Sequence, residues 1–211
     1  LCSSGCFHVK TSSRTNQNGY RYQWIGFASA TDVDGNPISK VGGYTGTGSA
    51  GTVQHGLSKA PEWIIIKERG NTNGFIVSHK GLTNQATYSV NMSNNNAEYS
   101  DAGTYYWNST APTSSVFSLN TNSAVNGSGS TYIAYCFASK KGFSKLSNYV
   151  GNASTDGPFI YTGFRPAFLL IKSYEGGSDW WGMSDNKRQT AVNNDARQNL
   201  LANTADNEGN L

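Results

Sequence analysis

An internal repeat constrains the fold of this chain more than any other feature. Residues 7–28 match residues 117–138 at a spacing of 110, as in Phe27 and Phe137. From Tyr44 onward a second match runs at a spacing of 105, as in Tyr44 and Tyr149. Self-similarity at a fixed spacing is typical of duplicated structural units. One complete unit therefore runs from about residue 44 to residue 138.

The two ends of the chain are out of phase with this unit. We expect four segments: closing strands of a preceding or permuted unit (1–28), a linker (29–43), a complete β-sandwich repeat (44–138) and an incomplete second repeat (139–211). Either the chain is a window from a longer protein, or residues 1–28 complete the second unit as a circularly permuted lobe. The sequence leaves both interpretations open.

Short runs rich in β-branched and aromatic residues predict the strands of the complete unit. These runs are 61–67, 75–79, 87–92, 115–119 and 131–138. Asn73–Gly74 and Gly176–Gly177 are expected to supply the positive φ angles of two equivalent hairpins. Residues 194–203 come closest to a helical period and are expected to form a strand or loop. The sequence predicts an all-β fold, an antiparallel β-sandwich of the lectin or jelly-roll type with a tandem repeat of about 105–110 residues.

Composition supports this fold class and argues against several kinds of partner. Charged residues make up only 14% of the chain, while 24 Gly, 12 Tyr, 9 Phe and 5 Trp suit many short strands joined by turns. The net charge of +3 comes from scattered Lys and Arg, so no nucleic-acid partner is expected. Apolar runs such as 63–67 are too short to span a bilayer, so no membrane insertion is expected.

The three cysteines, Cys2, Cys6 and Cys136, are an odd number without the spacing of a zinc site. We interpret them as free thiols, with Cys136 as a small core residue inside a strand. A bridge between Cys2 and Cys6 stays open as an alternative.

Two loops match ligand-binding patterns only in part. Residues 46–51, "GTGSAG", have the spacing of a dinucleotide-binding loop, but no helix pattern follows, so a turn is expected. Residues 32–37, "DVDGNP", could present oxygens from Asp32, Asp34 and Asn36 to calcium, but the acidic residue that completes an EF-hand is missing. A hairpin turn is the default interpretation. We expect no cofactor, with a structural calcium ion as the alternative.

No pattern of catalytic residues is present. The only histidines are His8, His55 and His79, and no Gly-x-Ser-x-Gly elbow accompanies them. The glutamates show no spacing that would pair two carboxylates on one face of a sheet. We therefore expect no catalytic residues and a protein that is not an enzyme.

Two aromatic clusters are the candidate binding residues. They are Tyr105, Tyr106 and Trp107 in the first cluster, and Trp180 and Trp181 in the second. Neighbouring residues of a strand point to opposite faces, so at least one ring of each cluster is expected to be exposed. Exposed aromatic rings offer flat apolar surfaces to sugar rings or to partner proteins.

Several linked phrases resemble a family of tailed-bacteriophage virion proteins of the marine-phage type. They include "YTGTGSAGTVQHGLSKAPEWIIIKERG", "TAPTSSVFSL", "YIAYCFA" and "GPFIYTGFRPAFLLIK". Members of this family are tail-fibre or tail-associated structural proteins with concanavalin-like β-sandwich repeats. Where the second unit should carry its own version of "YIAYCFA", the chain instead reads "DNEGNL".

The resemblance implies a non-enzymatic structural protein at the surface of the phage particle, made in the host cytoplasm and placed on the tail. Its implied partners are other virion proteins, its own copies in a homo-oligomer such as a trimer, and a glycan or receptor of the host surface. The alternatives are a carbohydrate-binding module for host recognition and, third, a capsid decoration protein or a glycan-degrading enzyme.

Overall fold

The computed structural model of the chain describes residues 30–31, 34–100, 105–186, 198–204 and 209–210, together with Asn18. Within these ranges the regular structure is β-strand, apart from the one-turn helix α1 (Ser123–Asn126). Every strand pairing is antiparallel, and two layers of strands face each other across a core. The predicted all-β sandwich is therefore confirmed.

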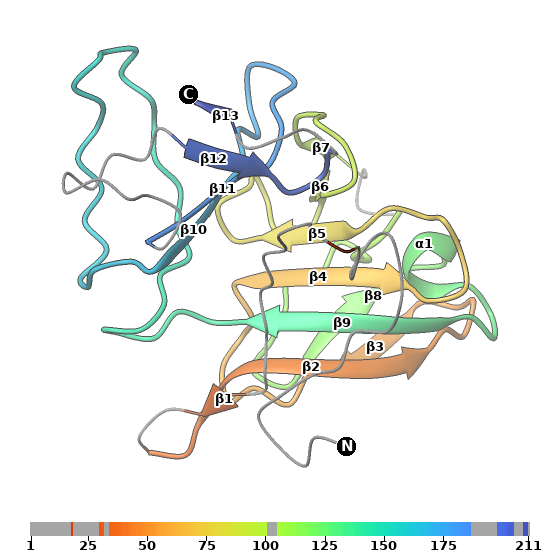
Figure 1. Cartoon of the computed structure of the whole chain (residues 1–211). Helices are drawn as coiled ribbons and strands as arrows, with labels where there is room; N and C mark the ends of the chain where they lie inside the picture. Colours follow the sequence, from red (N-terminus) through yellow and green to blue (C-terminus); the bar gives the residue numbers. More distant parts are fainter. Residues whose placement is uncertain are drawn as a thin grey trace.

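The larger layer is a seven-stranded sheet (Figure 1). Its strands lie in the order β1 (Ala30–Thr31), β2 (Pro37–Thr45), β9 (Thr131–Phe137), β4 (Trp63–Glu68), β5 (Ile76–His79), β6 (Tyr88–Asn91) and β7 (Tyr99–Ser100). The central strand β9 pairs with β2 on one side and with β4 on the other. Residues distant in sequence are thereby joined across the middle of the sheet.

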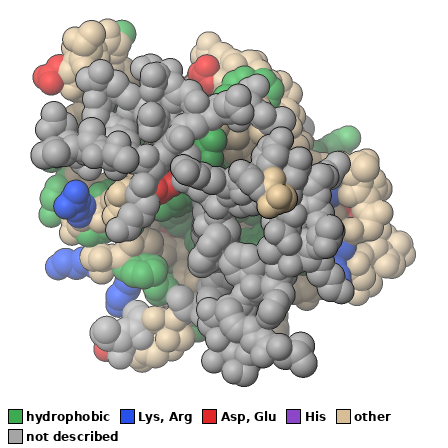
Figure 2. All heavy atoms as spheres, viewed as in Figure 1, with side chains coloured by type: hydrophobic (Ala, Val, Ile, Leu, Met, Phe, Trp, Pro, Cys, Tyr) green, Lys and Arg blue, Asp and Glu red, His purple; other side chains and the backbone are tan. Residues whose placement is uncertain are grey.

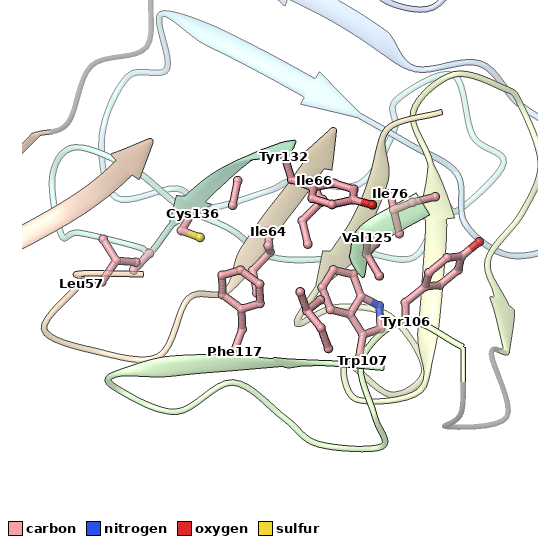
Figure 3. Packing of buried hydrophobic residues seen from close by; sticks show 13 residues of the cluster. Leu57, Ile64, Ile66, Ile76, Tyr106, Trp107, Phe117, Val125, Tyr132 and Cys136 are labelled. Carbon is pink, nitrogen blue, oxygen red and sulfur yellow. The ribbon is translucent and has the colours of Figure 1, made fainter. Parts of the chain in front are cut away.

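The second layer is the pair β3 (Gly51–Gln54) and β8 (Val116–Leu119), which lies behind β9 and β4 in Figure 1. Phe117 of β8 and the neighbouring Trp107 point toward Ile64 and Ile66 of β4 in the core (Figure 3). All four side chains are buried. The layer therefore covers one face of the large sheet.

The other face of the large sheet carries a second apolar core. Ile65, Val77 and Val90 lie on this face and are buried together with Trp181 from the C-terminal part of the chain. Since both faces are covered, β4 begins with four consecutive apolar residues, Trp63–Ile66, instead of an alternating pattern.

A separate four-stranded sheet packs beside β5 and β6 (Figure 1). Its order is β10 (Phe168–Ile171), β11 (Gly182–Asp185), β12 (Gln198–Leu201) and β13 (Gly209–Asn210). The indole N–H of Trp181 donates to the carbonyl oxygen of Asn91 at 3.3 Å and so links this sheet to the large one. We call the part of the molecule up to residue 138 the first lobe, and residues 139–211 the second lobe.

The structure corrects the predicted linker. Residues 37–43 form most of β2, which pairs with β9 from Ser39 opposite Phe137 to Thr45 opposite Thr131. Within the predicted linker, residues 30–31 and 37–43 therefore lie in strands of the sheet. The turn expected at 32–37 joins β1 to β2, with Gly35 at φ 80°.

The first predicted hairpin turn also needs correction. Neither Asn73 nor Gly74 has a positive φ. Residues 69–75 instead form a longer loop, held by the ammonium of Lys67, which donates to the carbonyl oxygens of Asn71 and Asn73. In the other hairpin Gly176 has φ 76°, as expected.

In the stretch 194–203, strand β12 occupies Gln198–Leu201, and residues 194–197 lie outside the described part of the chain. The repeat of about 105–110 residues and the segments 1–28, 44–138 and 139–211 stay predictions.

Candidate functional site

The first aromatic cluster has one exposed ring. Tyr105 is 53% exposed, whereas Tyr106 and Trp107 are buried. The indole N–H of Trp107 donates to the hydroxyl of Ser89 at 2.7 Å, inside the core. Tyr106 packs edge-on against Tyr99 of β7. Tyr106 and Trp107 are thus core residues, and only Tyr105 can present a ring face to a ligand.

The second aromatic cluster divides in the same way. Trp180 is 41% exposed, and Trp181 is buried between the two lobes. The backbone N–H of Trp181 also donates to the side-chain oxygen of Asn203. Trp180 is therefore the binding candidate of this cluster. Tyr105 and Trp180 belong to different lobes, so the five predicted residues do not form a single aromatic platform.

A pocket of about 200 Å³ lies where the two layers of the sandwich open between β2 and β3. Its lining is Lys40, Gly42, Gly43, Tyr44, Val53, Gln54, His55, Gly56, Phe117, Ala134 and Cys136. Sequence reasoning missed this pocket because its walls come from four strands that meet only after folding. Its three titratable groups in the interior are His55, Tyr44 and Cys136.

His55 is neutral, and both of its ring nitrogens are engaged. Nδ1 accepts the N–H of Leu57 at 3.1 Å, so the proton lies on Nε2, which donates to the carbonyl oxygen of Thr113 at 3.1 Å. Burial lowers the pKa of His55, although the bond to Thr113 opposes this effect. The imidazole has no free nitrogen with which to act as a base.

The other two groups are also held in their neutral forms. Burial, and secondly the neighbouring Tyr132, raises the pKa of Tyr44, whose hydroxyl donates to the carbonyl oxygen of Val125 at 2.5 Å. Burial raises the pKa of the Cys136 thiol to about 12. A thiol attacks as the thiolate, so Cys136 is inert near neutral pH, as expected of a core cysteine. The pocket can hold water or a small neutral molecule but presents no activated nucleophile.

A second hollow, of about 320 Å³, lies in the second lobe close to its junction with the first. It is lined by Ser139, Lys141, Gly142, Ser144, Lys145, Tyr161, Thr162 and Gly163. Two lysines make it cationic, but the hydroxyl of Ser144 is already bonded to the carbonyl oxygen of Ala138.

A polar cluster lies at the start of β4. Glu62 is paired with Lys80 at 2.7 Å and accepts a hydrogen bond from the hydroxyl of Ser139. Burial by itself would raise the pKa of Glu62, but these bonds and the charges of Lys80 and Lys59 outweigh it and lower the pKa. The cluster ties the β4–β5 hairpin to the segment that follows β9.

His79 lies beside this cluster. Its Nδ1 accepts the N–H of Gly81 at 2.9 Å. Burial lowers its pKa to about 4, Lys80 acts in the same direction, and Glu62 opposes both. His79 is therefore neutral at physiological pH and serves the structure of the hairpin end.

The weak calcium candidate is only partly described. Asp34 and Asn36 are exposed in the β1–β2 turn, and Asp32 lies outside the described residues. Within the described ranges no three His, Cys, Asp or Glu side chains come close enough to hold a metal ion. Cys2, Cys6 and His8 also lie outside those ranges.

On the face shown in Figure 2, the Lys and Arg side chains of the described residues lie apart, at the two margins of the molecule. In the same described part of the chain, no helix has the length and apolar character needed to cross a membrane.

These features define an all-β sandwich protein with a pocket between its two layers, in which His55, Tyr44 and Cys136 are held in their neutral forms. The chain belongs to the family described as a domain of unknown function (DUF7483), whose model matches residues 29–211. No curated protein and no solved structure matches the chain.

Proposed function

We propose that the chain is a non-enzymatic structural protein of a tailed-phage particle, a tail fibre or tail-associated surface module. One observation carries this proposal: the phrases that resemble such virion proteins coincide with the elements that build the sandwich. "APEWIIIK" leads into and covers β4, "TAPTSSVFSL" ends in β8, and "YIAYCFA" covers β9. The resemblance therefore lies in the architecture, as is expected for a structural module.

The chemistry of the described hollows supports the same proposal. Glycoside hydrolysis needs two carboxyl groups about 5–9.5 Å apart on either side of the scissile bond. Neither hollow is lined by Asp or Glu. His and Cys side chains often act in catalysis, and His55 and Cys136 line the first pocket. Both are neutral and held in place by the core. In this proposal the partners are other virion proteins and further copies of the chain at the particle surface.

Immunogold labelling of intact phage particles tests the proposal. An antibody raised against the 61–138 unit is expected to label the tail or its fibres. Label confined to the head would indicate a capsid decoration protein instead. Particles without label, in a preparation where a known tail protein is labelled, would reject a role in the virion.

A second candidate function is carbohydrate binding for recognition of the host surface. The observation in its favour is that Tyr105 and Trp180 are half exposed although each neighbours buried aromatic residues. Such rings can stack on the apolar face of a sugar.

Glycan-array binding of the purified chain tests this second function. Trp180→Ala and Tyr105→Ala are expected to reduce glycan binding at least tenfold, because each removes an exposed ring. Tyr161→Ala is the matched control, since Tyr161 is also exposed but lies outside both clusters. Equal losses in all three variants, or no glycan retained by the unaltered chain, would reject the candidate.

A further inference from the structure

The sheet of the second lobe reproduces part of the sheet of the first. β10–β13 have the same order and the same antiparallel pairing as β4–β7. The agreement extends to single hydrogen bonds. The carbonyl oxygen of Phe75 accepts the N–H of Met92 at 3.0 Å, and that of Trp181 accepts the N–H of Ala202 at 2.9 Å. These two pairs occupy equivalent places at the starts of β5 and β11.

Two further pairs of contacts agree. The N–H of Phe75 donates to the side chain of Ser93, and the N–H of Trp181 donates to the side chain of Asn203. The ammonium groups of Lys67 and Lys172 each donate to the carbonyl oxygen of the next residue. The positions of β4 and β10 therefore correspond at the sequence spacing of 105, and those of β6 and β12 at 110.

The two sheets differ at one edge. β4 has a neighbour on each side, β5 and β9. Among the residues that the structure describes, β10 pairs only with β11. In the described part of the chain, the second lobe thus has a free edge at the place where the first lobe has its central strand.

Burial shows the consequence of this free edge. Ile64 and Ile66 of β4 are fully buried, but their counterparts in β10, Leu169 and Ile171, are 40% and 44% exposed. Phe143, the counterpart of the buried Ile38 in β2, is 66% exposed. Apolar residues that a central strand and a covering layer bury in the first lobe are left open in the second.

The chain contains a segment with the sequence of the missing strand. Residues 21–27, "RYQWIGF", match β9, "TYIAYCF", at the spacing of 110, with Tyr22 at the position of Tyr132 and Phe27 at that of Phe137. This segment lies outside the described residues. In the register of β4 and β9, Phe27 would face Phe168, and Trp24 would face the exposed Ile171. The ring contact of Trp63 with Phe137, 4.9 Å between centroids, would then recur as Phe168 with Phe27.

The packing of the lobes favours a segment from the same chain. The core between the lobes contains residues from equivalent positions of both sheets: Ile65 corresponds to Leu170, and Phe75 corresponds to Trp181. Equivalent positions of the two sheets thus contribute to one core. The stretch of chain from the end of β9 to Phe143 contains a tight turn, in which the N–H of Phe143 donates to the carbonyl oxygen of Lys140. The corresponding stretch, from residue 28 to Ile38, has more residues.

We propose that the free edge of β10 is a strand-docking site, and that residues 21–27 of the same chain occupy it, antiparallel to β10 with Phe27 opposite Phe168. The docked strand gives the second lobe the central strand that β9 provides in the first, and it covers Leu169 and Ile171. The inference does not depend on a role in the virion.

Disulfide trapping in the full chain tests the register. Gly26→Cys with Leu169→Cys places two thiols at the positions equivalent to Cys136 and Ile64, which lie opposite each other in the first lobe. Cys2 and Cys6 are replaced by Ser, and the buried Cys136 is retained. The control, Ile25→Cys with Leu169→Cys, shifts one thiol to the opposite face of the strand.

Under mild oxidation the Gly26/Leu169 pair is expected to form an intramolecular disulfide at least tenfold faster than the control pair, independently of protein concentration. Equal rates for the two pairs would overturn the register. Covalent dimers whose yield rises with concentration would overturn docking within one chain.

A second measurement needs no substitution. Hydrogen exchange in the unaltered chain is expected to protect the amides of residues 22–27 to a degree similar to those of β9. Exchange of these amides within seconds, while β9 stays protected, would overturn the proposal even if the cysteine variants failed to fold.

Discussion

At the scale of single residues, Trp107 shows how a polar atom directs an aromatic side chain into the core. Its indole N–H reaches the buried hydroxyl of Ser89, 18 positions earlier in the chain. Trp107→Phe leaves this hydroxyl without its donor and removes ring volume, so a loss of about 2–4 kcal/mol in the free energy of unfolding is expected. Urea denaturation measures it. Ser89→Ala added to Trp107→Phe should cost less than the sum of the single changes; strict additivity would show that the bond contributes nothing.

His79 gives the protein a pH dependence at the same scale. Its pKa is about 4 in the folded protein, lowered first by burial and then by Lys80, against an ordinary value near 6.5. Between these values the unfolded chain binds more protons than the folded one. Stability is therefore lost as the pH falls through this window, by at most about 1.4 kcal/mol per pH unit.

His79→Asn removes this titration, while its amide oxygen can still accept the N–H of Gly81. The unfolding free energy of the unaltered protein is expected to fall between pH 7 and pH 5 by about 1–2 kcal/mol more than that of the variant. Urea titrations at the two pH values measure the difference. The same pH dependence in both proteins would contradict the assignment.

At the scale of elements, the turn after β2 depends on a close backbone approach. A Cβ on Gly46 would lie 2.3 Å from the carbonyl oxygen of Gly127, whereas a Cβ on Gly42, within β2, would meet nothing within 4 Å. Gly46→Ala is therefore expected to destabilise the protein by about 1–3 kcal/mol. Gly42→Ala is the matched control and should change stability by less than about 0.5 kcal/mol. Equal unfolding midpoints for the two variants would show that the turn relaxes without strain.

At the scale of the whole molecule, the two lobes are coupled through the buried Trp181. It packs in the core that contains Ile65 and Val77, and its indole bonds to Asn91. Trp181→Ala is expected to remove about 3–5 kcal/mol and to split thermal unfolding, followed by calorimetry, into two transitions. Trp180→Ala, at the exposed neighbour, should leave one transition at nearly the same temperature. A single transition in the Trp181 variant would mean that the lobes are joined elsewhere.

Prediction from sequence succeeded where a strand carries its own local pattern. β4 and β9 are rich in β-branched and aromatic residues, and both were predicted within one or two residues. β2 was missed because Gly42 and Gly43 resemble a linker. It is a strand because β9, some 90 positions later, supplies partners along its length.

The candidate binding residues were likewise predicted only in part. Because the aromatic residues of each cluster are neighbours in the sequence, at least one ring of each cluster was predicted to be exposed. Tertiary structure decided that these are Tyr105 and Trp180, because Ser89 and Asn91 provide acceptors for the indoles of Trp107 and Trp181.

The sequence by itself determined the all-β class and the main strands of the first lobe. It also predicted the repeat that relates one half of the chain to the other. These depend on composition and on spacing along the chain. Only the tertiary structure decided the central place of β9, the neutral groups of the pocket and the free edge of β10 among the described residues. Each of these depends on which distant segments share hydrogen bonds or exclude water together, and no local pattern encodes that choice.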